Sequence, residues 1–209
     1  MKQRVQTRAH ESGMTLVMTL LMLVMVLMFG LYAAQLALQG EKAARNDRDR
    51  HMAFQAAEAT LLDAEMDLEA SPDKEKSRSH LFAADSAIGF PMDAICSTGA
   101  QNIHLGLCGM SLEGQTPVWQ TVDFFNNDAN LISSVPYGKF TGQSFPVGSG
   151  SLPAKEPRYI VELMRDTKLG ERVDQVSYLY RITAIGFGAN PNTQVVLQTI
   201  YRKAQHAEK

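Results

Sequence analysis

The chain has 209 residues, of which 45% are hydrophobic and 20% are charged, and its formal net charge at pH 7 is −2. This length suits one domain with an anchor. The near balance of charges argues against the strong positive field that general nucleic-acid binding needs, so we expect no direct nucleic-acid binding.

A long apolar segment, residues 14–34, follows a short basic leader that contains Arg4 and Arg8. The segment has no charge, no proline and a single glycine, Gly30. A helix rises about 1.5 Å per residue, so about 20 residues cross a bilayer core of about 30 Å. A secretory signal has a shorter apolar core with a small residue after it, whereas here Gly13 stands before the run. We therefore predict a transmembrane helix over residues 14–34 with a cytoplasmic N-terminus.

The basic leader, Gly13 and the Met14-Thr15-Leu16 start of the apolar segment resemble the prepilin leader of type IV pilins and type II secretion pseudopilins. The resemblance implies that a prepilin peptidase removes residues 1–13 by cutting between Gly13 and Met14, and then methylates the new N-terminus. Most pilins have glutamate as the fifth residue of the mature chain. Here that position holds Met18.

The helical pattern continues beyond the apolar segment, because residues 41–69 contain no proline and are rich in good helix formers. Ser71-Pro72 ends the pattern, since proline disfavours helix in the residue before it. We therefore predict one helix over residues 14–70, followed by a globular periplasmic head over residues 71–209. Spacings of 3 and 4 predict its packed face, formed by Phe54, Ala57, Leu61, Ala64 and Leu68. Polar residues are predicted to lie mostly on the other side, namely Gln55, Glu58, Asp63, Asp67 and Glu69.

The middle of the chain, residues 73–150, is rich in glycine and proline and is expected to be mostly loops. Cys96 and Cys108 are the only cysteines. In a compartment beyond the inner membrane they are expected to form a disulfide, which for a loop of about 13 residues is worth roughly 3 kcal/mol. The alternative is two buried thiols. Residues 118–122 form either a short strand or an apolar plug, and Trp119 is expected in the core.

The last third of the chain is predicted to form strands over residues 158–163, 176–185 and 193–202, which are rich in Val, Ile, Thr and Tyr. Short connections favour an antiparallel meander. The expected fold class is therefore α+β, a pilin-like lollipop with a long N-terminal helix packed on an antiparallel β-sheet head.

Two stretches make the resemblance more specific. Residues 48–59 read R-D-R-H-M-A-F-Q-A-A-E-A and look like the R-D-R-x-x-A-F-x-A-A-E-A sequence of the PilX minor-pilin family. Residues 180–188 and 193–198 resemble the C-terminal sheet of that family. The resemblance runs from about residue 12 to residue 70 and resumes near the C-terminus.

This resemblance implies a subunit held in the inner membrane by a single span until it enters a pilus. It implies a complex with other minor pilins that primes assembly at the fibre tip, together with contacts to the major pilin and a tip adhesin. The pilus would then serve twitching motility, adhesion and DNA uptake.

No catalytic constellation is evident, because the chain lacks a P-loop, G-x-G-x-x-G and G-x-S-x-G. We expect no enzyme, no cofactor and no metal. His104 lies between the cysteines without a fourth ligand at the usual spacing. The cluster of Asp123, Asn126, Asn127 and Asp128 favours a turn over a calcium loop.

Methionines recur at helical spacing in the apolar segment, at Met14, Met18, Met22, Met25 and Met28. This stripe either packs against neighbouring pilin helices or faces lipid.

Two other functions remain open. A K-type pseudopilin usually has a larger head with calcium ligands, whereas about 140 residues follow the helix here. The second alternative function is that of a periplasmic enzyme or binding protein with a single membrane span.

Overall fold

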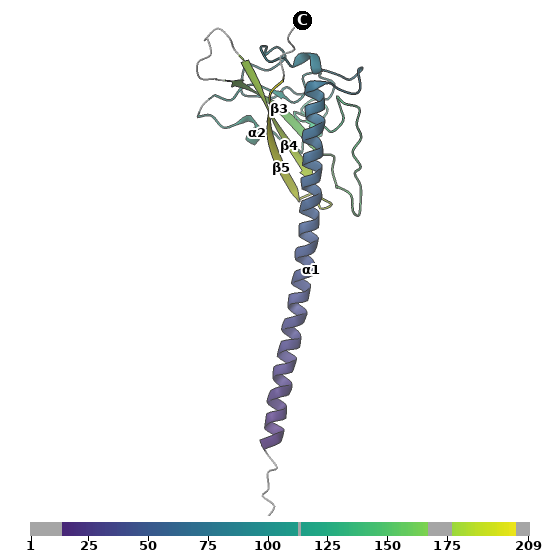
Figure 1. Cartoon of the computed structure of the whole chain (residues 1–209), viewed down its shortest axis with the longest axis vertical. Coiled ribbons are helices and arrows are strands. Elements are labelled where there is room, and N and C mark those ends of the chain that lie inside the picture. Colours follow the sequence, from purple (N-terminus) through teal and green to yellow (C-terminus); the bar gives the residue numbers. More distant parts are fainter. Residues whose placement is uncertain (1–13, 113, 167–176, 204–209) are drawn as a thin grey trace, which may run out of the picture. The chain divides into compact units, whose positions relative to one another are not determined.

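The structure, a computed structural model, describes residues 14–112, 114–166 and 177–203. It contains the following elements, labelled in Figure 1: α1 (Met14–Glu69), the 3-10 turn η1 (Ser79–Leu81), β1 (Leu107–Cys108), α2 (Val118–Thr121), β2 (Val135–Pro136), β3 (Arg158–Asp166), β4 (Ser177–Phe187) and β5 (Gln194–Tyr201). The chain divides into two compact units between Asp47 and Arg48.

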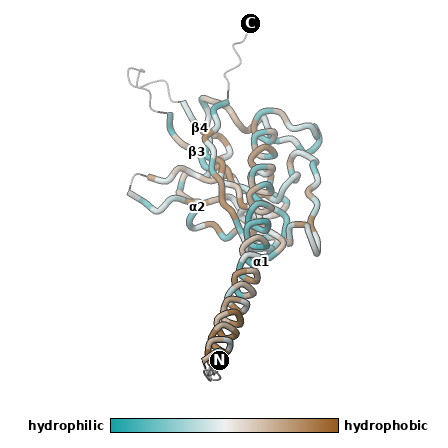
Figure 2. The backbone as a smooth tube through the Cα atoms, turned by 60° about the horizontal axis from the view of Figure 1, so that its bottom comes forward, coloured by the Kyte–Doolittle hydropathy of each residue, from teal (hydrophilic) through white to brown (hydrophobic). Residues whose placement is uncertain are grey.

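The described part of the first unit is the N-terminal portion of α1, residues 14–47. Every residue in it is exposed, and its apolar stretch is the brown part of the tube in Figure 2. The helix includes an apolar stretch that is long enough to cross a membrane, and no part of this stretch is buried. The pattern that predicts a membrane helix is therefore matched by a helix with an uncovered apolar surface.

The second unit contains a sheet with strand order β1-β3-β4-β5 and the last part of α1, residues 48–69, which packs on this sheet. Strands β3 and β4 pair antiparallel with Arg158 opposite Ile185, and β4 pairs antiparallel with β5. The two-residue strand β1 pairs parallel with β3, and β2 pairs antiparallel with it. The expected α+β class, with the long N-terminal helix on an antiparallel sheet, is confirmed.

Close packing between α1 and β4 depends on small residues. Ala53 and Ala57 on the helix are fully buried. A Cβ at Gly186 of β4 would lie 2.2 Å from the Ala53 carbonyl oxygen and 2.4 Å from the Ala57 nitrogen. Only glycine therefore lets the strand come this close to the helix backbone.

Each face of the sheet has its own hydrophobic core, because side chains alternate along a strand. Tyr159 and Val161 of β3 join the core that includes Ala64 and Leu68 of α1. Ile160, between them, joins the second core on the other face. That core also contains Cys108, Val118, Phe124, Ile185 and Phe187, with Trp119 packed against it.

Three details differ from the sequence predictions. Residues 118–121 form a short helix rather than a strand, because the Val122 N–H bonds the Val118 carbonyl at 3.2 Å and closes a turn. Val118 is buried, in agreement with the alternative of an apolar plug. Asp63 and Asp67 are fully buried, although their polarity predicted the outer side of the helix. Phe54, predicted on the packed face, is 39% exposed. The two aspartates are buried because donors from other segments satisfy their oxygens.

Candidate functional site

The first candidate site is the uncovered apolar surface at the start of α1. Met14, Met18, Met22 and Met25 are 77%, 58%, 69% and 59% exposed. They share one helical stripe, since residues three and four apart are neighbours on a helix. The hydroxyl of Thr19 donates to the Leu16 carbonyl at 2.9 Å, so this polar group is satisfied within the helix. The surface thus suits contact with lipid or with other apolar helices, because its exposure to water is unfavourable.

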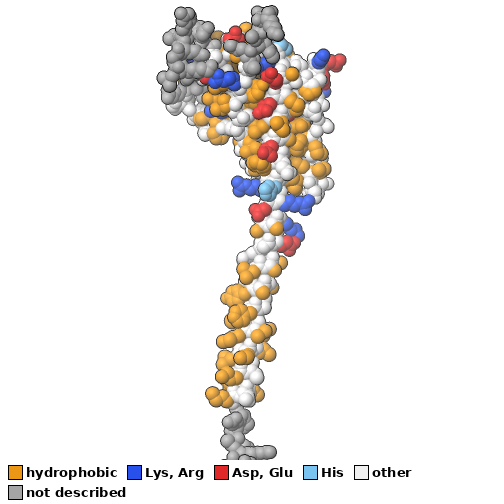
Figure 3. Space-filling model, viewed as in Figure 1, with side chains coloured by type: hydrophobic (Ala, Val, Ile, Leu, Met, Phe, Trp, Pro, Cys, Tyr) orange, Lys and Arg blue, Asp and Glu red, His pale blue; other side chains and the backbone are white. Residues whose placement is uncertain are grey.

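Charged residues begin where this surface ends, as Figure 3 shows along the helix. Glu41 and Arg45 form an exposed ion pair one turn apart, which contributes little to stability. Gly13, the residue before the predicted cleavage point, lies outside the described residues. Met14 is the first residue of the described helix.

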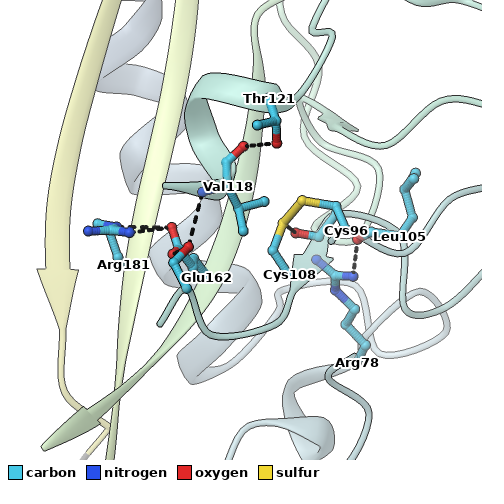
Figure 4. The surroundings of a disulfide bond; sticks show 10 residues. Arg78, Cys96, Leu105, Cys108, Val118, Thr121, Glu162 and Arg181 are labelled. Atoms are coloured by element: carbon cyan, nitrogen blue, oxygen red, sulfur yellow. Dashed lines mark hydrogen bonds and ion pairs between the residues drawn. A yellow bond between two sulfur atoms is a disulfide. The ribbon is translucent and has the colours of Figure 1, made fainter. Parts of the chain in front are cut away.

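The second feature is a disulfide in the head. Cys96 and Cys108 are bonded, with a Cα–Cα distance of 4.0 Å, as predicted (Figure 4). The Ser97 N–H bonds the Leu107 carbonyl at 2.9 Å, and the Gly106 N–H bonds the Ser97 carbonyl at 3.2 Å. The disulfide therefore closes a hairpin-like loop, residues 97–107, whose end is the short strand β1.

A buried polar cluster connects this loop to the helix. Arg78 and Asp67 are fully buried, and their closest atoms, Arg78 Nη2 and Asp67 Oδ2, are 2.7 Å apart. Arg78 Nη1 also donates to the carbonyls of Ile103 and Leu105, at 3.0 and 2.7 Å. The Tyr159 hydroxyl donates to Asp67 Oδ2 at 2.8 Å. One guanidinium thus joins α1, the disulfide loop and, through Asp67, strand β3.

Two further contacts stabilise this cluster. The Arg78 guanidinium carbon lies 3.7 Å from the centre of the Phe140 ring, a cation–π contact inside the core. Burial raises the pKa of Tyr159 well above its ordinary value, and the neighbouring Asp67 carboxylate raises it further. Tyr159 therefore stays protonated and remains a donor.

Asp63 forms a separate buried contact one helical turn earlier. Its carboxylate accepts the Gly138 N–H at 2.8 Å and the Thr141 hydroxyl. Burial raises the pKa of Asp63 above its ordinary value, although these two hydrogen bonds act in the opposite direction. The carboxylate holds the loop after β2 against the helix.

On the other face of the sheet, Glu162 of β3 is 1% exposed and pairs with Arg181 of β4, with 2.5 Å between Glu162 Oε2 and Arg181 Nη2. Ser111 donates to the same carboxylate at 2.8 Å and accepts the Val118 N–H at 3.1 Å. Figure 4 labels Arg181, Glu162 and Val118 beside the disulfide. This chain of contacts positions α2 rather than forming an open site.

Among the described residues, no group of three or more His, Cys, Asp or Glu side chains is arranged to hold a metal. The cluster around Asp123 forms turns, because Asp123, Asn126 and Asp128 each accept the N–H two residues later. The predicted turn is confirmed.

Comparison with protein-family models gives two matches. The PilX N-terminal model matches residues 12–61, and the model described as type IV pilus assembly protein PilX C-term matches residues 104–203. The chain belongs to the PilX family. No curated protein and no solved structure matches significantly.

The two PilX matches cover the parts described above. The N-terminal match includes the exposed methionine stripe and most of the helix that packs in the head. The C-terminal match includes β1 to β5 and one half of the disulfide, Cys108. Membership of the PilX family supports a minor pilin of the type IV pilus, which associates with other pilus components.

The sequence reasoning missed the Arg78 cluster and the Asp63 contact. A usable signal was present, because Ala53, Ala57, Thr60, Asp63 and Asp67 repeat at spacings of 3 and 4 and lie on the buried face. Polarity alone assigned the two aspartates to solvent, whereas their periodicity placed them with the buried residues.

Proposed function

We propose that this PilX-family minor pilin helps to prime pilus assembly, that it lies at the fibre tip in low copy number, and that it thereby supports twitching motility and adhesion. The observation that supports this proposal is Met18, which takes the place of the pilin glutamate. It is 58% exposed on the apolar surface of α1.

The effect of Met18 on assembly is electrostatic. A carboxylate in an apolar core is costly unless a charge of opposite sign neutralises it. In pilins the glutamate would meet the charged N-terminus of a neighbouring subunit in the fibre. Met18 cannot form that pair. A subunit that enters beneath an earlier one loses the pair, whereas the subunit that starts the fibre loses nothing.

Assembly requires that the apolar helix first be held in the inner membrane and then be buried against related helices. We propose that prepilin peptidase cuts between Gly13 and Met14 and that the new N-terminus is methylated. Met18, Met22 and Met25 would then pack against neighbouring helices, since methionine fills irregular gaps. The proposed neighbours are other minor pilins and the major pilin, with a tip adhesin beyond the head.

The decisive measurement is the copy number and position of the subunit in sheared pili. Quantitative mass spectrometry should find far fewer copies than of the major pilin, and labels on the head should gather at fibre ends. Abundant copies spaced evenly along the shaft would rule out the tip position. Deletion of the chain should lower the number of surface pili without changing the composition of the shaft.

A substitution tests the electrostatic reason itself. Met18→Glu restores the carboxylate and should let the subunit spread into the shaft. Met18→Gln is the matched control, because it is polar and of similar size but uncharged, and it should leave the subunit at the tip. Equal distributions for both variants would show that the charge does not decide the position.

A further inference from the structure

Strand β5 forms one outer edge of the sheet, and among the described residues no strand pairs with its free side. It is eight residues long. The opposite side of β3 is covered by the two short strands β1 and β2 instead. Within the part of the head that the structure describes, this long edge therefore has unpaired backbone groups, which are a template for another strand.

The composition of β5 offers none of the usual protection against such pairing. Its sequence, Q-V-V-L-Q-T-I-Y, contains no charge, no proline and no glycine. Natural edge strands are normally short, charged or interrupted by proline. Val196 and Ile200 are 44% and 60% exposed, and Gln198 between them is also exposed. The edge thus combines free backbone groups with an apolar, uncharged face.

The direction of β5 limits what can pair with it. Near its start, the Asn190 N–H bonds Asp49 of α1 at 3.1 Å. At its end the Tyr201 hydroxyl bonds Glu69, and Lys203 Nζ donates to the Leu68 carbonyl at 2.7 Å. Strand β5 therefore runs in the same direction as the part of α1 that packs in the head.

This direction argues against a second copy of the chain as the partner. Antiparallel pairing of two β5 strands would invert one head, so that its chain would enter at Arg48 from the opposite side. Subunits that enter one fibre with the same polarity cannot meet in that way, a step that rests on the proposed function. Parallel pairing would place residues 48–69 of the two α1 helices on opposite faces of the joined sheet, because a rotation about the strand direction turns one sheet over. In a fibre whose subunits present the same face of the head outward, that arrangement is also excluded.

We propose that the free edge of β5 binds an extended, uncharged segment of a different protein, which adds to the sheet as a further strand. Backbone hydrogen bonds would supply much of the affinity, and side chains at alternate positions would supply the specificity. The segment needs aliphatic side chains beside Val196 and Ile200, because a charge there would lose hydration without gaining a partner.

The first test uses the purified full chain in detergent and a synthetic peptide with the sequence of residues 194–201. A free peptide has no helix to restrict its direction. Paired antiparallel about Gln198, it places Val196 of each strand opposite Ile200 of the other, which is a favourable cross-strand contact. The control peptide has lysine in place of both aliphatic residues.

Hydrogen–deuterium exchange gives the result. Without peptide, the β5 amides that do not bond β4 should exchange quickly. Saturating peptide should slow them by roughly tenfold or more, since opening would then require loss of a strand pair. The control peptide should have no such effect. Slow exchange before any addition would mean that the edge is already covered, and unchanged exchange at saturation would mean that it does not pair. Either outcome overturns the proposal.

A pair of variants distinguishes binding at the β5 edge from binding to any exposed apolar side chain. Ile200→Lys should abolish the protection by the peptide. Leu131→Lys is the matched control, because Leu131 is 61% exposed and lies outside the sheet. Leu131→Lys should preserve the protection, and denaturant unfolding confirms that both variants are folded. Equal loss in both variants would assign the binding to non-specific apolar contact.

The second test identifies the occupant in cells. A photoreactive amino acid at position 200 should form one defined product with another protein, and Val196→Lys in the same chain should remove it. The same amino acid at position 131 should not form that product. A product with a second copy of this chain, or no product from position 200, would overturn the choice of partner. These results do not depend on fibre position, so they can fail while the proposed function stands.

Discussion

Arg78 and Asp67 form an ion pair in which neither side chain is exposed to solvent, although they come from different segments of the chain. The same guanidinium binds two carbonyls of the disulfide loop. Burying an ion pair is expensive, and such a pair is retained only with good geometry and with its remaining donors satisfied. Here both conditions are met, so the pair fixes one arrangement of helix, loop and sheet.

The first prediction concerns this pair. Arg78→Met should destabilise the head by about 3–5 kcal/mol, because it leaves the Asp67 carboxylate buried without its charge partner. Denaturant unfolding followed through Trp119, the single tryptophan, measures the change. Arg45→Met is the control, because it removes an exposed pair and should have no measurable effect. Combining Arg78→Met with Asp67→Asn should cost less than the sum of the two single changes. Strict additivity would contradict the coupling.

The second prediction concerns the disulfide. Replacing Cys96 and Cys108 together by serine should lower the free energy of unfolding by roughly 3 kcal/mol, because the unfolded chain regains the freedom of the closed loop. Reductant should destabilise the wild-type chain and leave the double variant unchanged. Peptide mapping without reductant should recover the two cysteines linked. Free thiols in protein from the periplasmic face would refute the bridge.

The third prediction is a dependence on pH. Burial raises the pKa of Asp63 in the folded state above its ordinary value of 3.8. The folded chain therefore binds more protons than the unfolded chain between these two values, and the contribution of Asp63 to stability falls as pH rises through that window. The difference in unfolding free energy between wild type and Asp63→Asn should decline there and then level off above the folded-state pKa.

Asp73 is the matched control for this experiment. Desolvation acts to raise the pKa of Asp73, but the N–H groups of Glu75 and Lys76 and the charge of Lys76 together lower it below its ordinary value. Its contribution should be lost as pH falls, so the difference between wild type and Asp73→Asn should slope in the other direction. If the two differences in unfolding free energy changed with pH in the same direction, the environment of Asp63 would not control its protonation.

The fourth prediction tests processing. In cells that contain prepilin peptidase, the mature chain should begin at Met14 with a methylated N-terminus, as shown by intact mass. Gly13→Arg should leave the chain at full length and held in the membrane. Gly30→Arg is unsuitable as a comparison because it places a charge in the span, so Arg8→Ala serves instead and should still be cut. Mature protein that begins at Met1 would remove the proposed pilin maturation.

Much of the architecture could be predicted from the sequence because its causes are local. An uncharged run from residue 14 to 34 has few alternatives to a membrane helix, and Ser71-Pro72 stops the helix wherever the head lies. The strands follow from their β-branched and aromatic residues, and their observed ends differ from the predicted ones by a few residues. The PilX sequence signature is likewise a property of consecutive residues.

The burial of Asp63 and Asp67 was decided by the tertiary structure. Each carboxylate is a solvent-facing group on an isolated helix, and it becomes an interior group only when Gly138, Thr141, Arg78 and Tyr159 bring donors to it from distant segments. Phe54 is the converse case, an apolar residue for which the fold provides no complete cover. The elements and the exposed apolar helix follow from composition and spacing, which are local properties of the chain. The burial of particular polar groups, and the sheet edge that stays unpaired among the described residues, depend instead on contacts between residues far apart in the chain, so they could be known only from the fold.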